Sequence, residues 1–313
     1  KGLEEFEHAC CMRYSWRLKF SRFAGKMPVF LYIFSIFFLA LVFAGGLFYI
    51  AYDYVHYSWK ILTVVGILSF LGCLQLSVSL VNWFSTLWVQ PQLLPRMDYS
   101  QEIPTECRSM VIIPTMLSSE SYIEELVEGL EIRYLANRQK NLHFGLLTDF
   151  PDADTETTLQ DNDLVALVKK RIEELNEKYT TPEANTFYLF HRPRKWNPRE
   201  KKWMGYERKR GKLSALNAFL RGGHNDFSLV IGDQEILTNI KYVITLDSDT
   251  QLPRESAWKF VAAMAHPLNH PVYDANKKRV VAGYGILQPR VEPSIPKPDV
   301  SLYLKMQGSL SGI

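Results

Sequence analysis

The feature that most constrains the fold is a run of 25 uncharged residues near the start of the chain, residues 28–52. As a helix at 1.5 Å per residue, this run spans about 37 Å, whereas the hydrocarbon core of a bilayer is about 30 Å thick. A second uncharged stretch covers residues 61–95, and its first two-thirds is also long enough to cross. The connection 53–60 is too short to form a domain. We therefore predict a transmembrane hairpin over residues 28–95.

The flanking residues indicate how this hairpin is oriented. Five Lys or Arg lie within residues 13–26, whereas the hairpin tip carries only Lys60. The positive-inside bias then places the basic segment 1–27 and everything after the hairpin in the cytoplasm. We expect helices at about 28–52 and 61–83, followed by an interfacial helix around Trp83 and Trp88.

Composition adds few further constraints. The formal net charge is +3, and the four cysteines show neither metal-ligand spacing nor a disulfide framework. Free thiols fit a multi-pass protein of a bacterial inner membrane with its soluble mass in the reducing cytoplasm. The sequence begins with Lys1 and ends without a terminal signal, so we expect the 313 residues to be part of a longer protein.

After the hairpin, apolar strand-like segments alternate with amphipathic helical segments, which predicts an α/β domain over residues 106–313, truncated at its C-terminal side. Short apolar strands in such a pattern predict a mainly parallel, Rossmann-like sheet with helices on both faces. Ligands of such sheets bind at the carboxyl ends of the strands. The predicted strands are 110–114, 144–147, 187–190, 242–246 and 280–287, and the predicted helices are 119–139, 161–179, 212–221 and one beginning near 254.

The most specific chemical signal follows the predicted strand 242–246. Asp247 and Asp249 stand two residues apart, and in extended geometry such residues share a face. Two carboxylates with open positions suit Mg²⁺ or Mn²⁺ shared with substrate phosphates. The alternative is a polar turn that caps the next helix. A phosphatase signature of the form Asp-x-Asp-x-Thr/Val fits poorly, because Gln251 occupies its last position and the pair comes late in the domain.

Three other segments carry a functional and a structural interpretation each. Asp149 follows the strand 144–147, where it would bind a ribose or base edge or stand in an acidic turn. The segment 191–212 contains ten Lys or Arg against two Glu, interleaved with aromatic residues. It would approach a diphosphate at Gly211, bind single-stranded nucleic acid, or form a solvated loop, and a membrane hairpin makes nucleic acid the least favoured. The glycines of Gly283-Tyr-Gly285 mark either a ligand's close approach or a bend.

These motifs, taken in order, resemble the glycosyltransferase domain of cyclic β-1,2-glucan synthases over about residues 106–295. More broadly the chain is similar to processive inverting transferases with the GT-A fold, including linear glucan and cellulose synthases. The matching segments are Val111-Ile-Ile-Pro-Thr115, Leu146-Leu-Thr-Asp149-Phe, Glu207-Arg-Lys-Arg-Gly-Lys-Leu213, Tyr242-Val-Ile-Thr-Leu-Asp-Ser-Asp-Thr-Gln-Leu-Pro253, Met264-Ala-His-Pro-Leu-Asn269 and Gly283-Tyr-Gly-Ile-Leu-Gln-Pro-Arg-Val291.

The resemblance implies a UDP-glucose donor, a growing glucan acceptor, and a cytoplasmic GT-A-like site beside the lipid bilayer. The implied roles divide along the donor. Thr115 and Asp149 would contact uridine, and Asp247 would face the nucleotide and, with Asp249, hold the metal. The diphosphate would be approached by Arg208, Lys209 and Lys212, and the donor sugar or acceptor by Gln288.

One departure from the family limits this interpretation. Such enzymes carry a downstream acidic motif that supplies the general base and a Gln-x-x-Arg-Trp-like motif near the acceptor, and neither occurs in the 313 residues. An inverting transfer needs a base to deprotonate the acceptor hydroxyl. No catalytic residue is therefore identified, and we expect activity to need downstream domains of the same polypeptide. The alternatives are another processive polysaccharide synthase or a non-catalytic, membrane-anchored nucleotide-binding module.

Overall fold

The computed structural model describes residues 9–11, 15, 28–54, 59–88, 93–179, 186–289 and 291. The chain separates into two compact units. One comprises Lys1–Gln92 together with Val291–Ile313, and the other is Leu93–Arg290. Each unit is described by itself.

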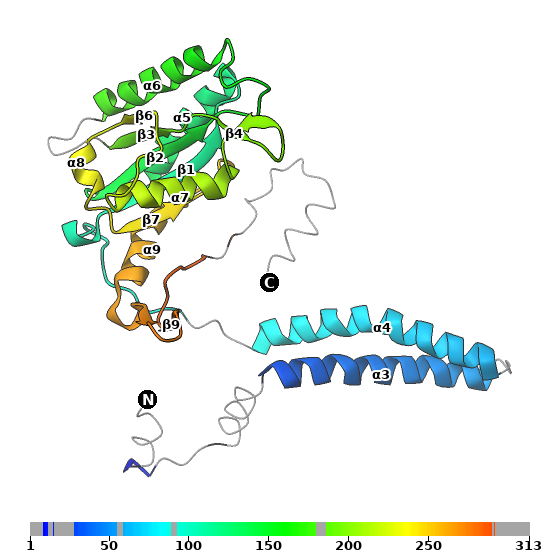
Figure 1. Cartoon of the computed structure of the whole chain (residues 1–313). Helices are drawn as coiled ribbons and strands as arrows, with labels where there is room; N and C mark the ends of the chain where they lie inside the picture. The colour runs from blue at the N-terminus through cyan, green and yellow to red at the C-terminus, as the bar shows by residue number, and fades with distance from the viewer. Residues whose placement is uncertain are drawn as a thin grey trace. The chain divides into compact units, whose positions relative to one another are not determined.

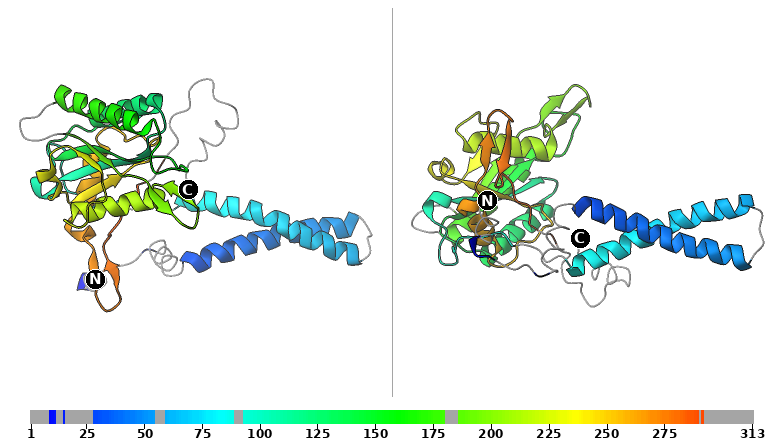
Figure 2. Two further views of the ribbon diagram at one scale, coloured as in Figure 1. Left: turned by 45° about the horizontal axis from the view of Figure 1, so that its top comes forward. Right: turned by 90° about the horizontal axis from the view of Figure 1, so that it is seen from below.

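Two long helices dominate the described part of the first unit, α3 (Pro28–Tyr54) and α4 (Trp59–Trp88). They lie side by side (Figures 1 and 2), and the Tyr32 hydroxyl donates to Asn82 Oδ1 at 2.8 Å. Most of their apolar side chains face outward, and both helices are long and apolar enough to cross a membrane. Helix α4 runs unbroken to Trp88, so within the described residues the predicted interfacial segment continues this helix.

The second unit is built on a five-stranded sheet with the order β6-β3-β2-β1-β7. Its strands are β1 (Ser109–Met116), β2 (Leu142–Asp149), β3 (Phe187–His191), β6 (Leu229–Ile231) and β7 (Tyr242–Thr245). All neighbours pair in parallel except β3 and β6, which are antiparallel. The mainly parallel sheet predicted from the sequence is confirmed. The antiparallel edge strand β6 escaped prediction because three half-buried residues leave too short a pattern.

Helices cover both faces of this sheet (Figure 1). On one face α5 (Glu120–Ala136), α6 (Asp161–Lys178) and α9 (Ser256–Ala265) share a core with alternate strand residues such as Val111 and Leu146. On the other face α7 (Arg208–Leu220) and the short α8 (Gln234–Leu237) pack on residues such as Ile112 and Tyr188. Burial on both faces explains why β1 to β3 are continuous apolar runs.

Two small hairpins complete the described fold. Strands β4 (Lys195–Asn197) and β5 (Lys202–Met204) form one within the basic segment, and β8 (Val272–Asp274) pairs with β9 (Arg279–Ala282) in the other. Single 3₁₀ turns occupy Thr105–Cys107 and Pro267–Asn269. The prediction of a sheet strand over 280–287 is wrong, because β9 is exposed and short.

Gly283 accounts for the end of β9. Its φ is 68°, and a Cβ at this position would lie 1.9 Å from the His270 carbonyl oxygen. A residue with a side chain would be strained there, so the glycine serves a tight backbone bend. Of the two interpretations for this motif, the bend is the one the structure supports.

The two-faced core makes a stability prediction. Leu146 is fully buried in the central strand β2, whereas Leu159 is fully exposed. Leu146→Ala should lower the free energy of unfolding by about 2–5 kcal/mol, because it removes buried methyl groups and leaves a cavity. Leu159→Ala should stay within about 0.5 kcal/mol of the parent in urea denaturation. Equal effects of the two substitutions would contradict this core.

Candidate functional site

The strand order creates a switch point between β1 and β7. From β1 the chain passes through α5 to β2 on one side, and β7 is later added on the other side of β1. Pairing of β1 with β7 stops at Ile112 and Thr245, before Pro114, which has no N–H to donate. The carboxyl ends of β1 and β7 are therefore not hydrogen-bonded to each other as neighbouring strands. In open α/β sheets, ligands bind in the crevice at this kind of point.

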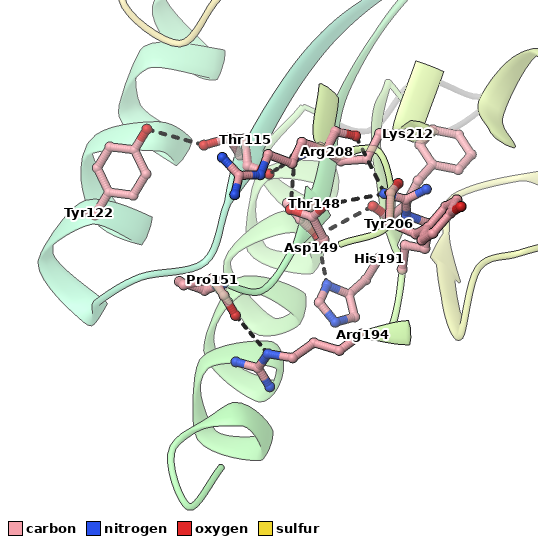
Figure 3. Close-up of polar contacts among 12 residues, drawn as sticks. Thr115, Tyr122, Thr148, Asp149, Pro151, His191, Arg194, Tyr206, Arg208 and Lys212 are labelled. Carbon is pink, nitrogen blue, oxygen red and sulfur yellow. Dashed lines mark hydrogen bonds and ion pairs between the residues drawn. The ribbon is translucent and has the colours of Figure 1, made fainter. Parts of the chain in front are cut away.

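Asp149 lies at the carboxyl end of β2 and is almost completely buried. Its Oδ1 pairs with Lys212 Nζ at 2.8 Å, and its Oδ2 with an Arg192 guanidinium nitrogen at 3.4 Å. The Lys212 ammonium also donates to the Thr115 carbonyl oxygen at the end of β1 (Figure 3). Lys212 thus joins the ends of β1 and β2 to the first turn of α7.

Lys212 lies in a buried place that disfavours charge. Burial lowers the pKa of Lys212, and the neighbouring Asp149 carboxylate opposes that shift. Removing one partner of a buried ion pair leaves the other charge uncompensated, which costs about 3–5 kcal/mol. This contact therefore fixes the register of α7 against the sheet edge.

Two glycines allow the first turn of α7 to approach Asp149. A Cβ on Gly205 would lie 2.0 Å from Asp149 Oδ2, and a Cβ on Gly211 would lie 2.1 Å from the Tyr206 carbonyl oxygen. Helix α7 also begins earlier than the predicted Lys212, since residues 208–212 form its first turn rather than a loop. The backbone at Glu207 and Arg208 has positive φ, which makes the sharp entry into the helix.

Asp247 and Asp249 lie in a turn rather than in extended chain. Strand β7 ends at Thr245, and the Thr250 N–H donates to the Asp247 carbonyl oxygen at 3.0 Å. The expectation that alternation along a strand would bring the carboxylates together is therefore wrong in its geometry. Both carboxylates remain exposed, while Ser248 and Thr250 are half-buried. The alternative role as a cap of the next helix is not taken up, since Glu255 occupies the N-cap of α9.

The remaining predicted residues fall into two groups. Lys209 donates to Asp247 Oδ1, so α7 reaches the turn after β7. Arg208 pairs instead with Asp152 Oδ2 at 2.9 Å. Gln288 is exposed in the segment after β9, and among the described residues no hydrogen bond joins it to the cluster.

Thr115 and the turn after β7 are linked through helix α5. The Tyr122 hydroxyl donates to Ser248 Oγ at 3.2 Å and shares a hydrogen bond with Thr115 Oγ1 at 3.1 Å. Sequence reasoning missed Tyr122, because a tyrosine on a helix gives no signal of its partners. It also missed Arg192, although this arginine comes directly after β3 and such positions meet at the carboxyl edge.

The carboxylates of Asp247 and Asp249 suit a metal ion that is shared with a ligand. Among the described residues no three His, Cys, Asp or Glu side chains gather into a protein-only cation site. Mg²⁺ commonly keeps several waters and binds through one or two carboxylates together with substrate phosphates. The exposed pair Asp247 and Asp249 fits that type of site. In this structure the Lys209 ammonium donates a hydrogen bond to the Asp247 carboxylate.

A second buried cluster lies beside Asp149. Arg194 makes a two-pronged ion pair with Asp161, whose oxygens lie 2.5 and 3.2 Å from the guanidinium nitrogens. His191 Nδ1 lies 2.9 Å from Thr148 Oγ1. Burial lowers the pKa of His191 to about 4. The ring is therefore neutral near pH 7 and serves the packing of the site rather than its charge.

His191 makes a pH prediction. The ordinary pKa of histidine is 6.5, so below that value the unfolded chain binds a proton that the folded chain refuses until about pH 4. Stability should therefore fall as the pH drops from 6.5 towards 4. His191→Asn should flatten this slope in urea denaturation at several pH values, because the variant has no ring to protonate on unfolding. An unaltered slope in the His191 variant would contradict the buried neutral ring.

Comparison with known proteins identifies the family. The chain is similar to the cyclic beta-(1,2)-glucan synthase NdvB of Rhizobium meliloti (strain 1021), with 39% identity over 219 residues. This alignment covers 70% of the chain but only 8% of the synthase, so the chain matches a small part of that protein. No protein-family model matches the chain. From this identity the chain belongs to the family of cyclic β-(1,2)-glucan synthases, of which it represents one part.

Proposed function

We propose that this chain is the donor-binding part of a membrane-bound, inverting glycosyltransferase of the GT-A type that uses UDP-glucose to build β-1,2-glucan. One observation carries the proposal: the exposed Asp247 and Asp249 pair stands at the switch point beside the ends of β1 and β2. The identity with a cyclic glucan synthase supports the substrate class.

The diphosphate of the donor would lie between the turn after β7 and the first turn of α7. Asp247 and Asp249 would hold Mg²⁺ or Mn²⁺, which when bound neutralises the charge that develops on the departing diphosphate. Lys209 is half-exposed and pairs with Asp247. With a cation on that carboxylate, Lys209 would be free to bind a phosphate oxygen. Arg208, also exposed, would contribute a second positive charge.

Thr115 and Asp149 would recognise uridine at the carboxyl ends of β1 and β2. In this conformation the Asp149 carboxylate is covered by Gly205 and neutralised by Lys212. A direct contact with the base therefore requires the backbone at Gly205 to move away. Lys212, with its ammonium buried, would act by orienting Asp149 and Thr115 rather than by touching the diphosphate.

Transfer to the acceptor requires groups beyond this donor site. Inversion needs a base that takes the acceptor's proton, and we assign no residue to that role. Gln288 would approach the donor sugar or the growing glucan only if the exposed segment after β9 closes over the donor. The alignment covers only 8% of the glucan synthase, so the base and the rest of the acceptor site would come from other parts of such a protein.

The apolar helices would anchor the enzyme in the bacterial inner membrane. Their length, their outward apolar side chains and the basic residues before α3 support this topology. The transferase unit would then face the cytoplasm, where nucleotide sugars are made available.

Loss of the carboxylates tests the proposal. In the full-length protein, Asp247→Asn and Asp249→Asn should each weaken Mg²⁺- or Mn²⁺-dependent UDP-glucose binding at least about tenfold, because each removes a charged oxygen from the metal. Asp163→Asn, an exposed carboxylate on α6, is the matched control and should bind as the parent does. Calorimetric titration with and without metal measures this.

The identity of the product decides between transferases. Linkage analysis of glucan made by the full-length protein should give β-1,2 bonds, and a purely β-1,4 product would favour another processive synthase. Unchanged metal-dependent binding in both aspartate variants would instead remove the support for any enzyme of this type.

A further inference from the structure

Helix α5 carries one charged residue on its buried side, and this residue faces the turn after β7. Six residues of α5 are buried, of which five are aliphatic or aromatic and the sixth is Arg133. Arg133 is 7% exposed. A charge in such a place is costly unless its hydrogen-bonding groups are satisfied. The hydrogen bonds of the Arg133 side chain therefore indicate its role in the fold.

The guanidinium of Arg133 binds backbone oxygens of the turn. One Nη2 nitrogen donates to the Ser248 and Thr250 carbonyl oxygens, both at 2.7 Å, and Nε donates to Thr250 at 3.1 Å. The planar fork of arginine suits two acceptors at once, which a lysine ammonium on its flexible stem does not reproduce. Arg133 thus grips the turn at two residues that alternate with Asp247 and Asp249.

The four residues of this turn differ in their exposure to solvent. Ser248 and Thr250 are half-buried towards the helix, whereas Asp247 and Asp249 are exposed. Burial lowers the pKa of Arg133, and the negative charge of Asp249 opposes that shift, so the guanidinium also lies within electrostatic reach of a carboxylate. The hydrogen bonds from Arg133 therefore fix the backbone that carries both carboxylates.

Further hydrogen bonds from α5 and its C-cap hold neighbouring parts of the same segment. Tyr122 binds the Ser248 hydroxyl, and after the last turn of α5 Asn137 binds the Leu252 carbonyl oxygen at 3.4 Å and the Ala257 N–H at 3.0 Å. Residues 11 positions apart lie on one face of an α-helix, so Tyr122 and Arg133 form a row along α5, and Asn137 follows at the C-cap of the helix. This row supports the segment from Ser248 to the start of α9.

Gly129 makes room for the guanidinium. A Cβ at this position would lie 2.8 Å from Arg133 Nη1, closer than such contacts are found. Glycine is a poor residue for the interior of a helix, and alanine there would favour the helix itself. The glycine is therefore explained by the space that Arg133 needs.

We propose that Arg133 is a positioning residue for the donor site, which holds the turn 247–250 so that the carboxylates of Asp247 and Asp249 face the metal and the sugar diphosphate. This inference rests on the proposed function. It assigns the ordering of the metal-binding turn to a helix on the far side of that turn from the ligand. Arg133 itself touches neither the metal nor the donor.

The test compares three variants in the full-length protein. Arg133→Met removes the donors, Arg133→Lys keeps the charge but not the fork, and Gly129→Ala leaves Arg133 in place while crowding its guanidinium. The matched control is Arg138→Met, an exposed arginine just after α5 that contacts Tyr134 and Tyr179. UDP binding is titrated against Mn²⁺, and uridine binding is measured alongside.

All three variants should raise the Mn²⁺ concentration for half-maximal UDP binding, by about 10- to 100-fold for Arg133→Met, as expected when an outer support of a metal ligand is lost. Uridine binding should remain within about twofold, because neither the metal nor the diphosphate takes part in it. Gly129→Ala should raise the Mn²⁺ requirement without lowering the melting temperature. If Arg133 had only a structural role, this combination would not occur. Arg138→Met should match the parent.

The results of this experiment distinguish failure of the positioning role of Arg133 from failure of the proposed function. If the parent protein binds UDP with Mn²⁺ and the Arg133→Lys and Gly129→Ala variants require no more metal than the parent does, the positioning role is overturned and the proposed function stands. These two variants also decide the matter if Arg133→Met does not fold. If the parent shows no metal-dependent UDP binding, both proposals fall together.

Discussion

The buried ion pair between Lys212 and Asp149 is the contact on which the edge of the sheet depends. It brings the ends of β1 and β2 and the first turn of α7 to one point, through the Thr115 carbonyl oxygen and the Asp149 carboxylate. Two charges withdrawn from water are tolerated only with close geometry and further hydrogen bonds. Arg192 supplies a second cation, and the glycines at 205 and 211 allow the close packing.

This contact has a consequence for the residues around it. Because Lys212 anchors α7, Lys209 one turn earlier is directed to Asp247 on the other side of the switch point. Helix α5 supports the same turn from behind, through Tyr122 and Arg133. Two helices on opposite faces of the sheet therefore converge on four residues, 247–250. The backbone of this turn is therefore hydrogen-bonded from one side, while the side chains of Asp247 and Asp249 are exposed to solvent.

Much of this fold follows from local pattern. Continuous apolar runs predicted β1, β2 and β3, because burial on both faces demands such runs. Strand β7 was predicted from its short apolar run as well, although its residues alternate between half-buried and exposed. Asp149 and Lys212 were predicted as site residues, yet not as partners, since a contact across 63 residues leaves no spacing signal. The short strands β6, β8 and β9 were missed or misplaced, because three or four residues that are half-buried or exposed show no pattern that distinguishes them from a loop.

The turn after β7 illustrates why geometry needs the structure. The spacing of Asp247 and Asp249 predicts alternation along a strand, but strand β7 stops at Thr245. The pairing ends there because β1 reaches Pro114, which has no N–H to donate to β7. The arginine that holds this turn lies 115 residues earlier than Ser248. Residue type and spacing predict the two carboxylates as site residues, whereas tertiary contacts determine how the turn that carries them is held.

The most direct measurement of the central claim is a structure of the full-length protein with UDP and Mn²⁺, in which anomalous scattering locates the metal. The switch-point site predicts manganese on the carboxylates of Asp247 and Asp249, with the diphosphate towards Lys209 and the uridine towards the ends of β1 and β2. Nucleotide and metal bound elsewhere, for example at the opposite end of the strands beside Arg108, would contradict it.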